Sequence, residues 1–251
     1  MTGRSLLLVH DDPDSDREYL RQPGTELQTD LGVVTIPEDA APGDRLETHL
    51  GEPFRVRRLR GPDLFDHFER TGAPMLPRDV GLIVGETGAQ SGDTVLDAGT
   101  GTGVLAACLA RLGATVVTYE IDPEFADVAR ENTRLAGVAE TVDVRTGDVT
   151  DALDELAARD PGFDLLTLDT ADAPAVVARA PDLLRRGGFC AVYSPFVEDA
   201  REVAVTARET ALTGVETVET IQRELDVGDR GTRPDTAGVG HSGYLTFARL
   251  E

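Results

Sequence analysis

The sequence of 251 residues contains no lysine and no tryptophan, and it has only two cysteines and two methionines. Cys108 and Cys190 lie at apolar-periodic positions, so we expect small buried side chains rather than a disulfide or a metal pair. The histidines are scattered without metal-ligand spacing, so no metal is expected. No apolar run approaches the roughly 20 residues of a membrane span, and the N-terminal apolar stretch is too short for a signal peptide. These absences favour a cytoplasmic protein without a membrane partner.

The missing lysine accompanies a large excess of acids. Asp and Glu number 46, against 24 basic residues that are all arginine, and the formal net charge is −22. Such a surface ordinarily repels polyanions, but at molar salt the Debye length falls to about 3 Å and only charges in contact interact. The composition resembles that of proteins from salt-loving archaea, and we expect a haloarchaeal source. A GC-rich genome also replaces lysine by arginine, but it does not by itself account for the acids.

The central motif is an apolar strand that runs into glycines. Residues 94–98 predict a buried strand, and Gly99, Gly101 and Gly103 follow at alternate positions before a helix. Such glycines let the backbone turn tightly and approach a ligand closely. A dinucleotide site has the spacing G-x-G-x-x-G and directs its helix at a pyrophosphate. The shorter spacing, with Asp97 at the strand tip, favours a ligand with an ammonium group and a ribose, such as S-adenosylmethionine (SAM).

Two further strands end in acids at the intervals of a βαβ fold. Residues 115–120 end at Glu120, where a carboxylate can accept hydrogen bonds from both ribose hydroxyls. Residues 142–148 end at Asp148, which can accept from an adenine amino group. Each acid alone is also typical of a solvated turn, but the three motifs in this order favour SAM. The candidate cofactor contacts are Asp97, Gly99, Thr100, Gly101, Thr102, Gly103, Glu120, Phe125, Asp148 and Asp169.

The order of elements predicts the fold class. From residue 94 onward, strand-like runs alternate with helical segments, which is typical of a doubly wound, mostly parallel sheet. Residues 215–225 and 244–250 predict two strands joined without a helix, and hence an antiparallel edge. We expect residues 71–251 to form a class I SAM-dependent methyltransferase domain, Rossmann-like, with a seven-stranded sheet. Ligands of such sheets bind at the carboxyl ends of the strands, where the four candidate acids converge. The expected helices are 78–88, 103–112, 123–136, 173–184 and 199–213, and Gly187-Gly188 predicts a turn before a strand at 189–193.

A small β-rich domain is expected over residues 1–70. Runs at residues 5–9, 32–36 and 54–59 are separated by turn sequences and fit an antiparallel barrel or meander. A short helix at 61–70 and a breaker-rich linker at 71–77 follow. The last strand is the most basic segment of the chain, and its arginines either contact phosphates or pair with surplus acids on a solvated face. The candidate phosphate-contacting residues are Arg55, Arg57, Arg58 and Arg60.

Asp169 follows an apolar strand at residues 163–168, which we expect beside the strand that leads to the glycines. Methyl transfer from a sulfonium is an in-line displacement that depends on orientation. A carboxylate that accepts from the 6-amino group of adenine increases the electron density on N1 and stabilises the cationic product. Asp169 is the candidate for that role; the alternatives are a contact to the SAM amino group or a helix cap.

Along nearly its whole length, the chain resembles the tRNA (adenine-N1)-methyltransferases that modify a T-loop adenosine. The glycine motif is shared by many methyltransferases, but Thr-His-Leu-Gly-Glu at residues 48–52 and the ending at residues 233–245 are more particular. The resemblance implies an N-terminal domain that contacts tRNA, a SAM-binding catalytic domain and a homotetramer. It also implies Asp169 as the catalytic residue at the target adenine, and His241 on the substrate side unless it is an ordinary turn residue. The implied target is position 58, and archaeal members also act on the adjacent adenosine.

The family commonly has tyrosine at the position of Leu76, close to the reacting base. An aromatic platform for the flipped base is therefore missing, or is supplied by Phe196 or a neighbouring subunit. A methyltransferase of protein carboxyls or small molecules shares the glycine strand and Glu120, but it does not account for the N-terminal domain and the tail. A non-catalytic RNA-binding paralogue would have lost the glycines or Asp169. The glycine spacing disfavours a dehydrogenase.

Overall fold

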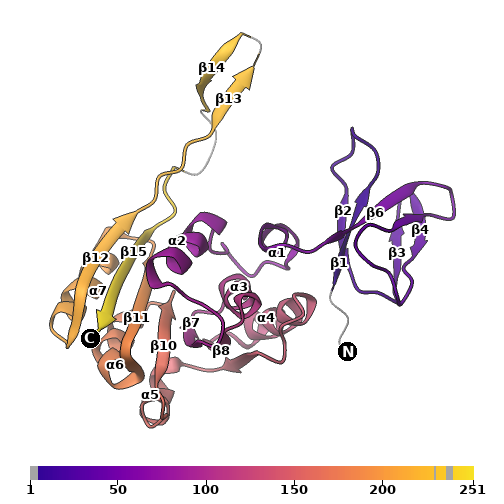
Figure 1. Cartoon of the computed structure of the whole chain (residues 1–251). Helices are drawn as coiled ribbons and strands as arrows, with labels where there is room; N and C mark the ends of the chain where they lie inside the picture. The colour runs from indigo at the N-terminus through magenta and orange to yellow at the C-terminus, as the bar shows by residue number, and fades with distance from the viewer. Residues whose placement is uncertain (1–4, 229, 236–239) are drawn as a thin grey trace.

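The computed structural model describes residues 5–228, 230–235 and 240–251. It consists of a small N-terminal β unit and a larger α/β domain, joined through the short helix α1 (Gly61–His67), and a two-stranded hairpin extends from the larger domain (Figure 1). No helix in these ranges is long and apolar enough to cross a membrane.

The β unit contains a four-stranded antiparallel sheet in the order β2-β1-β6-β5 and a separate hairpin, β3–β4. Its own core includes Leu8, Leu27, Val34 and Phe54. The three predicted strands are confirmed as β1, β4 and β6, whereas the other three, of three or four residues each, are too short to give a clear alternation of apolar and polar residues. The strands are β1 (Leu6–His10), β2 (Glu18–Arg21), β3 (Glu26–Thr29), β4 (Gly32–Thr35), β5 (Arg45–Glu47) and β6 (Pro53–Arg58).

Helix α1 belongs to the larger domain by its packing. Leu59, Leu64 and Phe68 are buried in the same core as Val80 and Ile83 of the next helix. The packing of α1 thus lies with the larger domain, and the domain boundary expected at residue 70 stays a prediction.

The larger domain is built on a seven-stranded sheet in the order β12-β15-β11-β10-β7-β8-β9. Strands β7 to β11 pair in parallel, and β15 runs antiparallel to both of its neighbours. The predicted class I methyltransferase fold and its antiparallel edge are confirmed. The strands are β7 (Thr94–Ala98), β8 (Thr115–Glu120), β9 (Val142–Thr146), β10 (Phe163–Leu168), β11 (Leu184–Ser194), β12 (Leu212–Glu219) and β15 (Tyr244–Leu250).

Helices cover both faces of this sheet, which explains the continuous apolar runs of its central strands. Val95 and Leu165 face the core formed with α3, whereas Leu96 and Leu166 face the core formed with α6. The helices are α2 (Pro77–Thr87), α3 (Val104–Leu112), α4 (Pro123–Leu135), α5 (Leu153–Ala157), α6 (Ala173–Leu183) and α7 (Val197–Arg208), with a 3-10 turn η1 (Val149–Ala152).

Two expectations for the C-terminal half need correction. Gly187-Gly188 is not a turn before the strand but an irregularity inside β11, where the pairing with β10 shifts register. Gly187 has a positive φ of 86°, which a glycine adopts without strain. The segment between β12 and β15 is also more than a connection, because it contains the hairpin of β13 (Leu225–Gly228) and β14 (Gly231–Pro234).

Candidate active site

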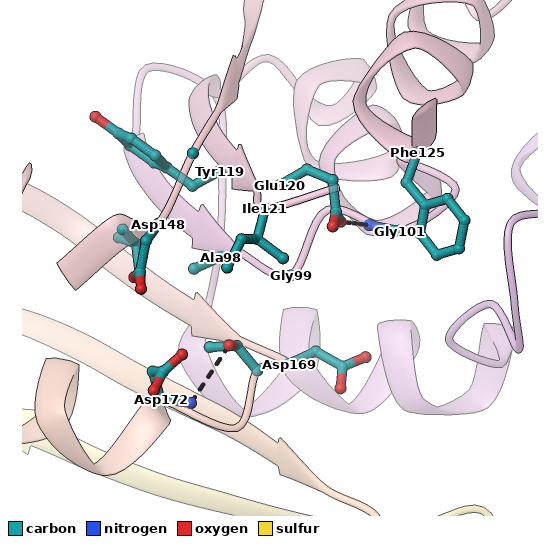
Figure 2. Close-up of a pocket in the computed structure, with 13 residues that line it drawn as sticks. Ala98, Gly99, Gly101, Tyr119, Glu120, Ile121, Phe125, Asp148, Asp169 and Asp172 are labelled. Carbon is teal, nitrogen blue, oxygen red and sulfur yellow. Dashed lines mark hydrogen bonds between the residues drawn. The ribbon is translucent and has the colours of Figure 1, made fainter. Parts of the chain in front are cut away.

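A cavity of about 270 Å³ lies at the carboxyl ends of β7, β8 and β10. Figure 2 shows Glu120, Asp148 and Phe125 on one side of it and Asp169 and Asp172 on the other. Its position follows from the topology, because β10 and β8 flank the first strand of the parallel sheet and their ends meet at one edge. The lining residues are Ala98, Gly99, Gly101, Tyr119, Glu120, Ile121, Phe125, Gly147, Asp148, Val149, Asp169, Thr170 and Asp172.

Glu120 is fixed by the glycine loop that it faces. One carboxylate oxygen accepts from the backbone N–H of Gly101 at 2.9 Å, and the other accepts from the N–H of Asp122 at 3.1 Å. Each oxygen keeps a second lone pair. The carboxylate is therefore oriented at the cavity wall with capacity for further hydrogen bonds.

Gly99 makes the approach of two strand ends possible. A Cβ on Gly99 would lie 1.9 Å from the carbonyl oxygen of Asp169, and its φ is 87°. The N–H of Asp169 in turn donates to the carbonyl of Ala98 at 2.8 Å. The absence of a side chain at residue 99 thus lets the Asp169 backbone pack directly against the glycine loop.

The side chain of Asp169 has a large accessible surface, but this surface faces the cavity, whose walls surround the carboxyl on most sides. Burial between these walls, together with the negative charges of Asp97 and Glu120, raises the pKa of its carboxyl from 3.8 to about 7. Asp169 is therefore a carboxyl group whose ionisation responds to a cation bound nearby.

Asp97 has a different environment from the other acids. Its two carboxylate oxygens accept from the hydroxyls of Thr118 at 2.6 Å and Thr167 at 2.5 Å, and the residue is buried. Burial raises the pKa of Asp97, and these two hydrogen bonds oppose the change. The hydroxyl of Thr100 bonds to that of Thr118 at 2.5 Å, which extends the network to the glycine loop.

The remaining predicted cofactor residues lie around the same loop. Asp148 lines the cavity and accepts from the N–H and the hydroxyl of Thr150. Phe125 lines the cavity from the first turn of α4. Thr102 is buried, and Gly103, with a φ of 76°, is the residue that precedes α3.

A second cavity, of about 40 Å³, lies on the other side of the glycine loop. Gly99, Gly101 and Asp169 line both cavities, so the two meet at these residues. The far wall of the second cavity is the linker, through Ala73, Pro74 and Met75. In the linker, only Leu76 was expected near the reacting base, from the family resemblance. The contribution of residues 73–75 to the site was missed because proline and glycine indicate a break and not a contact.

His241 lies outside both cavities. Its Nδ1 is 2.6 Å from a Glu219 carboxylate oxygen, and its Nε2 is 3.4 Å from the Pro195 carbonyl. The hydrogen bond to Glu219, followed by that to Pro195, raises the pKa of His241. The imidazole therefore sits near the carboxyl end of β11, and its substrate role stays a prediction.

The end of β11 meets the C-terminal segment of the family resemblance near Asp169. The hydroxyl of Tyr193, at the end of β11, donates to the carbonyl of Ser242. A Cβ on Gly243 would lie 2.5 Å from the Tyr193 ring, so a larger residue there would require the ring to move. Burial raises the pKa of Tyr193, and the charges of Asp169 and Asp79 add to this effect. Asp79 is itself buried at the start of α2.

The four arginines in and just after β6 fall into two groups. Arg55 donates to Asp11 at 2.6 Å, and Arg57 is paired with Glu18. Arg58 and Arg60 are exposed, and no ion pair joins them to another residue in the described ranges. The structure thus favours the solvated-face interpretation for the first two and leaves phosphate contact open for the others.

Several cavity residues were not among the predicted contacts. Asp172 and Thr170 follow Asp169, and Ile121 follows Glu120. Ile121 is 68% exposed, and a large apolar residue directly after a strand-tip acid was a signal that sequence reasoning could have used. Within the described residues, no group of three or more histidine, cysteine or acidic residues is placed to hold a metal ion.

The residues present fit SAM. The cavity offers oriented acceptors, as the hydroxyls and amino groups of SAM require, and negative groups suit a ligand that carries a sulfonium and an ammonium. Apolar surface from Ile121 and Phe125 is available for a purine. Fold and site together define a class I SAM-dependent methyltransferase, and a family model described as a methyltransferase domain matches residues 89–229.

Comparison with known proteins narrows this class. TrmI of Methanocaldococcus jannaschii, named a tRNA (adenine(57)-N(1)/adenine(58)-N(1))-methyltransferase, is 31% identical over 268 residues, which cover 95% of this chain and 93% of the relative. The tRNA (adenine(58)-N(1))-methyltransferase TrmI of Thermus thermophilus is 29% identical over 214 residues, which cover 84% of this chain and 82% of the relative. The chain therefore belongs to the TrmI family of tRNA (adenine-N1)-methyltransferases.

Solved structures agree on the fold over the whole chain. A SAM-dependent O-methyltransferase from Thermotoga maritima superposes with a TM-score of 0.77 at 25% identity, covering 100% of this chain and 94% of that one. TrmI from Aquifex aeolicus superposes with a TM-score of 0.71 at 23% identity, covering 98% and 96%. The small N-terminal unit is thus part of the shared architecture.

Proposed function

We propose that this protein transfers a methyl group from SAM to N1 of a T-loop adenosine in tRNA. The observation that carries the proposal is Asp169, which lines both cavities at the point where β10 meets the glycine loop. Membership of the TrmI family supports the substrate class.

The two cavities divide the cofactor between them in this proposal. Glu120 accepts from the ribose hydroxyls and Asp148 from the adenine amino group, with Ile121 and Phe125 against the ring. The second cavity, between the glycine loop and the linker, takes the amino-acid end. Bound there, SAM supplies an electrophilic methyl group on a sulfonium.

Asp169 then acts on the target base. Its carboxylate accepts a hydrogen bond from the 6-amino group, which increases electron density on N1 and stabilises the positive charge that methylation creates. A carboxyl with a pKa of about 7 is partly protonated at neutral pH in the absence of ligands. The positive sulfonium nearby favours the ionised form, so the residue becomes a full acceptor when the donor is present.

We propose position 58 as the target, and position 57 as the second position to test, because the name of the M. jannaschii relative includes both. The half-buried Leu76 precedes α2, where the family commonly has an aromatic residue. Phe196 is 66% exposed and lines neither cavity. A neighbouring subunit is then the remaining source of an aromatic platform.

The tRNA contact is assigned to the small β unit through Arg58 and Arg60. Both are exposed at the end of β6, whereas Arg55 and Arg57 already have acidic partners. Phosphate contacts of this kind position an RNA without reading its sequence.

The proposal includes a homotetramer, which the hairpin β13–β14 supports. All eight residues of its two strands are exposed, among them Leu225 at 59% and Val227 at 75%. An isolated two-stranded hairpin is marginally stable in water, so a second copy of this chain is the partner that fits these free edges. Light scattering should give a smaller particle for a Leu225→Asp/Val227→Asp variant than for the wild type; equal masses would contradict this assignment.

A second candidate function has one specific observation in its favour, the full-length likeness to an O-methyltransferase. To separate the two, the purified protein is incubated with methyl-labelled SAM and, in parallel, unmodified tRNA transcript, total cell protein or a small-molecule extract. Label in the tRNA alone supports the proposal. Label in protein or small molecules without label in tRNA would refute it.

A further inference from the structure

Asn132 is a fully buried side chain of α4 whose role the site description has not used. Its amide group makes three hydrogen bonds, all to the backbone of other segments. The side-chain NH2 donates to the carbonyls of Glu69 and Thr102, both at 2.9 Å, and the side-chain oxygen accepts from the N–H of Glu69 at 3.2 Å. Both donors and the acceptor of the amide are thus in use.

The two segments that Asn132 joins both border the proposed cofactor site. Thr102 belongs to the glycine loop and lines the second cavity. Glu69 stands four residues before Ala73, the first of the linker residues that form the opposite wall. A single buried amide therefore connects the two sides of the cavity that we assign to the amino-acid end of SAM.

The same segment is attached at its other end by a separate contact. Arg111, in α3, donates to the carbonyl of Leu59 at 2.6 Å and to that of Ala136 at 3.2 Å. Residues 59–69, which include α1, are thus held at both ends, and the Asn132 end is bonded to the glycine loop. This arrangement separates attachment of the small β unit from contact with the cofactor site.

We propose that Asn132 is a positioning residue that couples the cofactor site to the linker on one side of Glu69 and, through residues 59–69, to the small β unit on the other. The Asn132 amide bonds both Thr102 and Glu69, so a displacement of Thr102 changes the position of Glu69 as well. A ligand that fixes the glycine loop therefore also orders the linker that follows Glu69. Coupling is reciprocal, so tRNA on the β unit strengthens cofactor binding. This second half rests on the proposed function; the first half needs only the cofactor.

The test uses hydrogen exchange on the full-length protein with S-adenosylhomocysteine as an unreactive ligand. In the wild type, the ligand should slow exchange in a peptide covering residues 66–76 by at least about fivefold, the lower end of coupling between linked sites. In Asn132→Ala, that protection should be lost while protection of residues 99–103 remains. Wild-type protein without protection at 66–76 would overturn the proposal, and so would full protection in the variant.

Two matched variants separate positioning from stability. Thr133→Val changes a similarly buried neighbour whose hydroxyl donates to the carbonyl of Arg130 in the same helix, so linker protection should persist. Arg111→Ala removes the remote attachment and should also leave ligand-dependent protection at 66–76. Loss of protection in either variant to the same extent as in Asn132→Ala would contradict a specific role for the amide. The wild-type measurement decides the question if Asn132→Ala does not fold.

A second arm measures the affinity for S-adenosylhomocysteine with and without tRNA transcript. Wild-type protein should bind the ligand at least about fivefold more tightly when tRNA is present, and Asn132→Ala less than about twofold. Equal factors in both proteins would overturn the coupling. If tRNA does not bind at all, the proposed function fails, whereas exchange at residues 66–76 still tests the positioning role by itself.

Discussion

Replacing Asp169 by asparagine should abolish methyl transfer and at the same time stabilise the fold above neutral pH. The carboxyl has a pKa of about 7 in the folded protein, against 3.8 for the unperturbed group. Between these values the folded state holds a proton that the unfolded state has lost, so stability falls as the pH rises from about 4 to about 7 and stays lower above that. Each pKa unit corresponds to about 1.36 kcal/mol, which gives about 4 kcal/mol for a sealed site.

Solvent reduces this figure, because Asp169 is exposed to the cavity. Screening by water in an open cleft leaves an expected cost of about 1–2 kcal/mol. Asp169→Asn removes the titrating group with little change in size. The variant should therefore be about 1–2 kcal/mol more stable than the wild type near pH 8, and the difference should shrink toward pH 4.

Urea unfolding followed by circular dichroism measures both proteins across this pH range, at a constant high salt concentration. A general relief of charge repulsion is controlled by Asp39→Asn, an exposed acid that forms no ion pair within the described residues. Methyl transfer should fall at least about 100-fold in Asp169→Asn, with SAM affinity within a few-fold of the wild type. A variant that is no more stable than the control at high pH would refute the argument for the raised pKa. Collapse of SAM binding would instead make Asp169 a cofactor ligand only.

Three further predictions concern the loop, the β unit and the surface. Gly99→Ala should lower SAM affinity at least about tenfold, by a strain of more than 1.4 kcal/mol, because the alanine Cβ would overlap the Asp169 carbonyl. Gly43→Ala controls for backbone strain, because Gly43 has a similar φ but open space around it. Equal effects of the two substitutions on SAM affinity would argue against the overlap. Arg58→Ala/Arg60→Ala should raise the tRNA Michaelis constant more than Arg55→Ala/Arg57→Ala does, and the reverse order in steady-state assays would reassign the contact. Lowering the salt from about 1 M to about 0.1 M lengthens the Debye length from about 3 to about 10 Å and should lower the melting temperature, whereas a melting temperature that is unchanged in dilute buffer would contradict adaptation to salt.

The catalytic domain was predictable because its signals are local. Buried parallel strands give short apolar runs, and a strand-tip acid such as Glu120 or Asp148 is visible in the sequence itself. The glycines that follow β7 report a close backbone approach, and the structure identifies the neighbour at Gly99 as the backbone of Asp169. These features led to the correct fold and to residues that line one cavity.

The features that were not predicted depend on distant partners. Arg55 and Arg57 look basic in sequence, but the acids that pair with them, Asp11 and Glu18, lie 44 and 39 residues away. Asn132 has no distinguishing sequence context, because its three bonds go to backbone groups. The hairpin β13–β14 was also missed, since its strands have four residues each and no buried face.

The most direct test of the account maps the methylated atom. Wild-type protein is incubated at high salt with SAM and an unmodified tRNA transcript, and with matched transcripts that carry guanosine at position 58 or at position 57. Nuclease digestion and mass spectrometry should then find 1-methyladenosine in the T-loop of the unmodified transcript, and the transcript with guanosine at 58 should lose that product there. Methylation at a different atom or outside the T-loop, or no methylation of tRNA by a protein that binds SAM, would contradict the central claim.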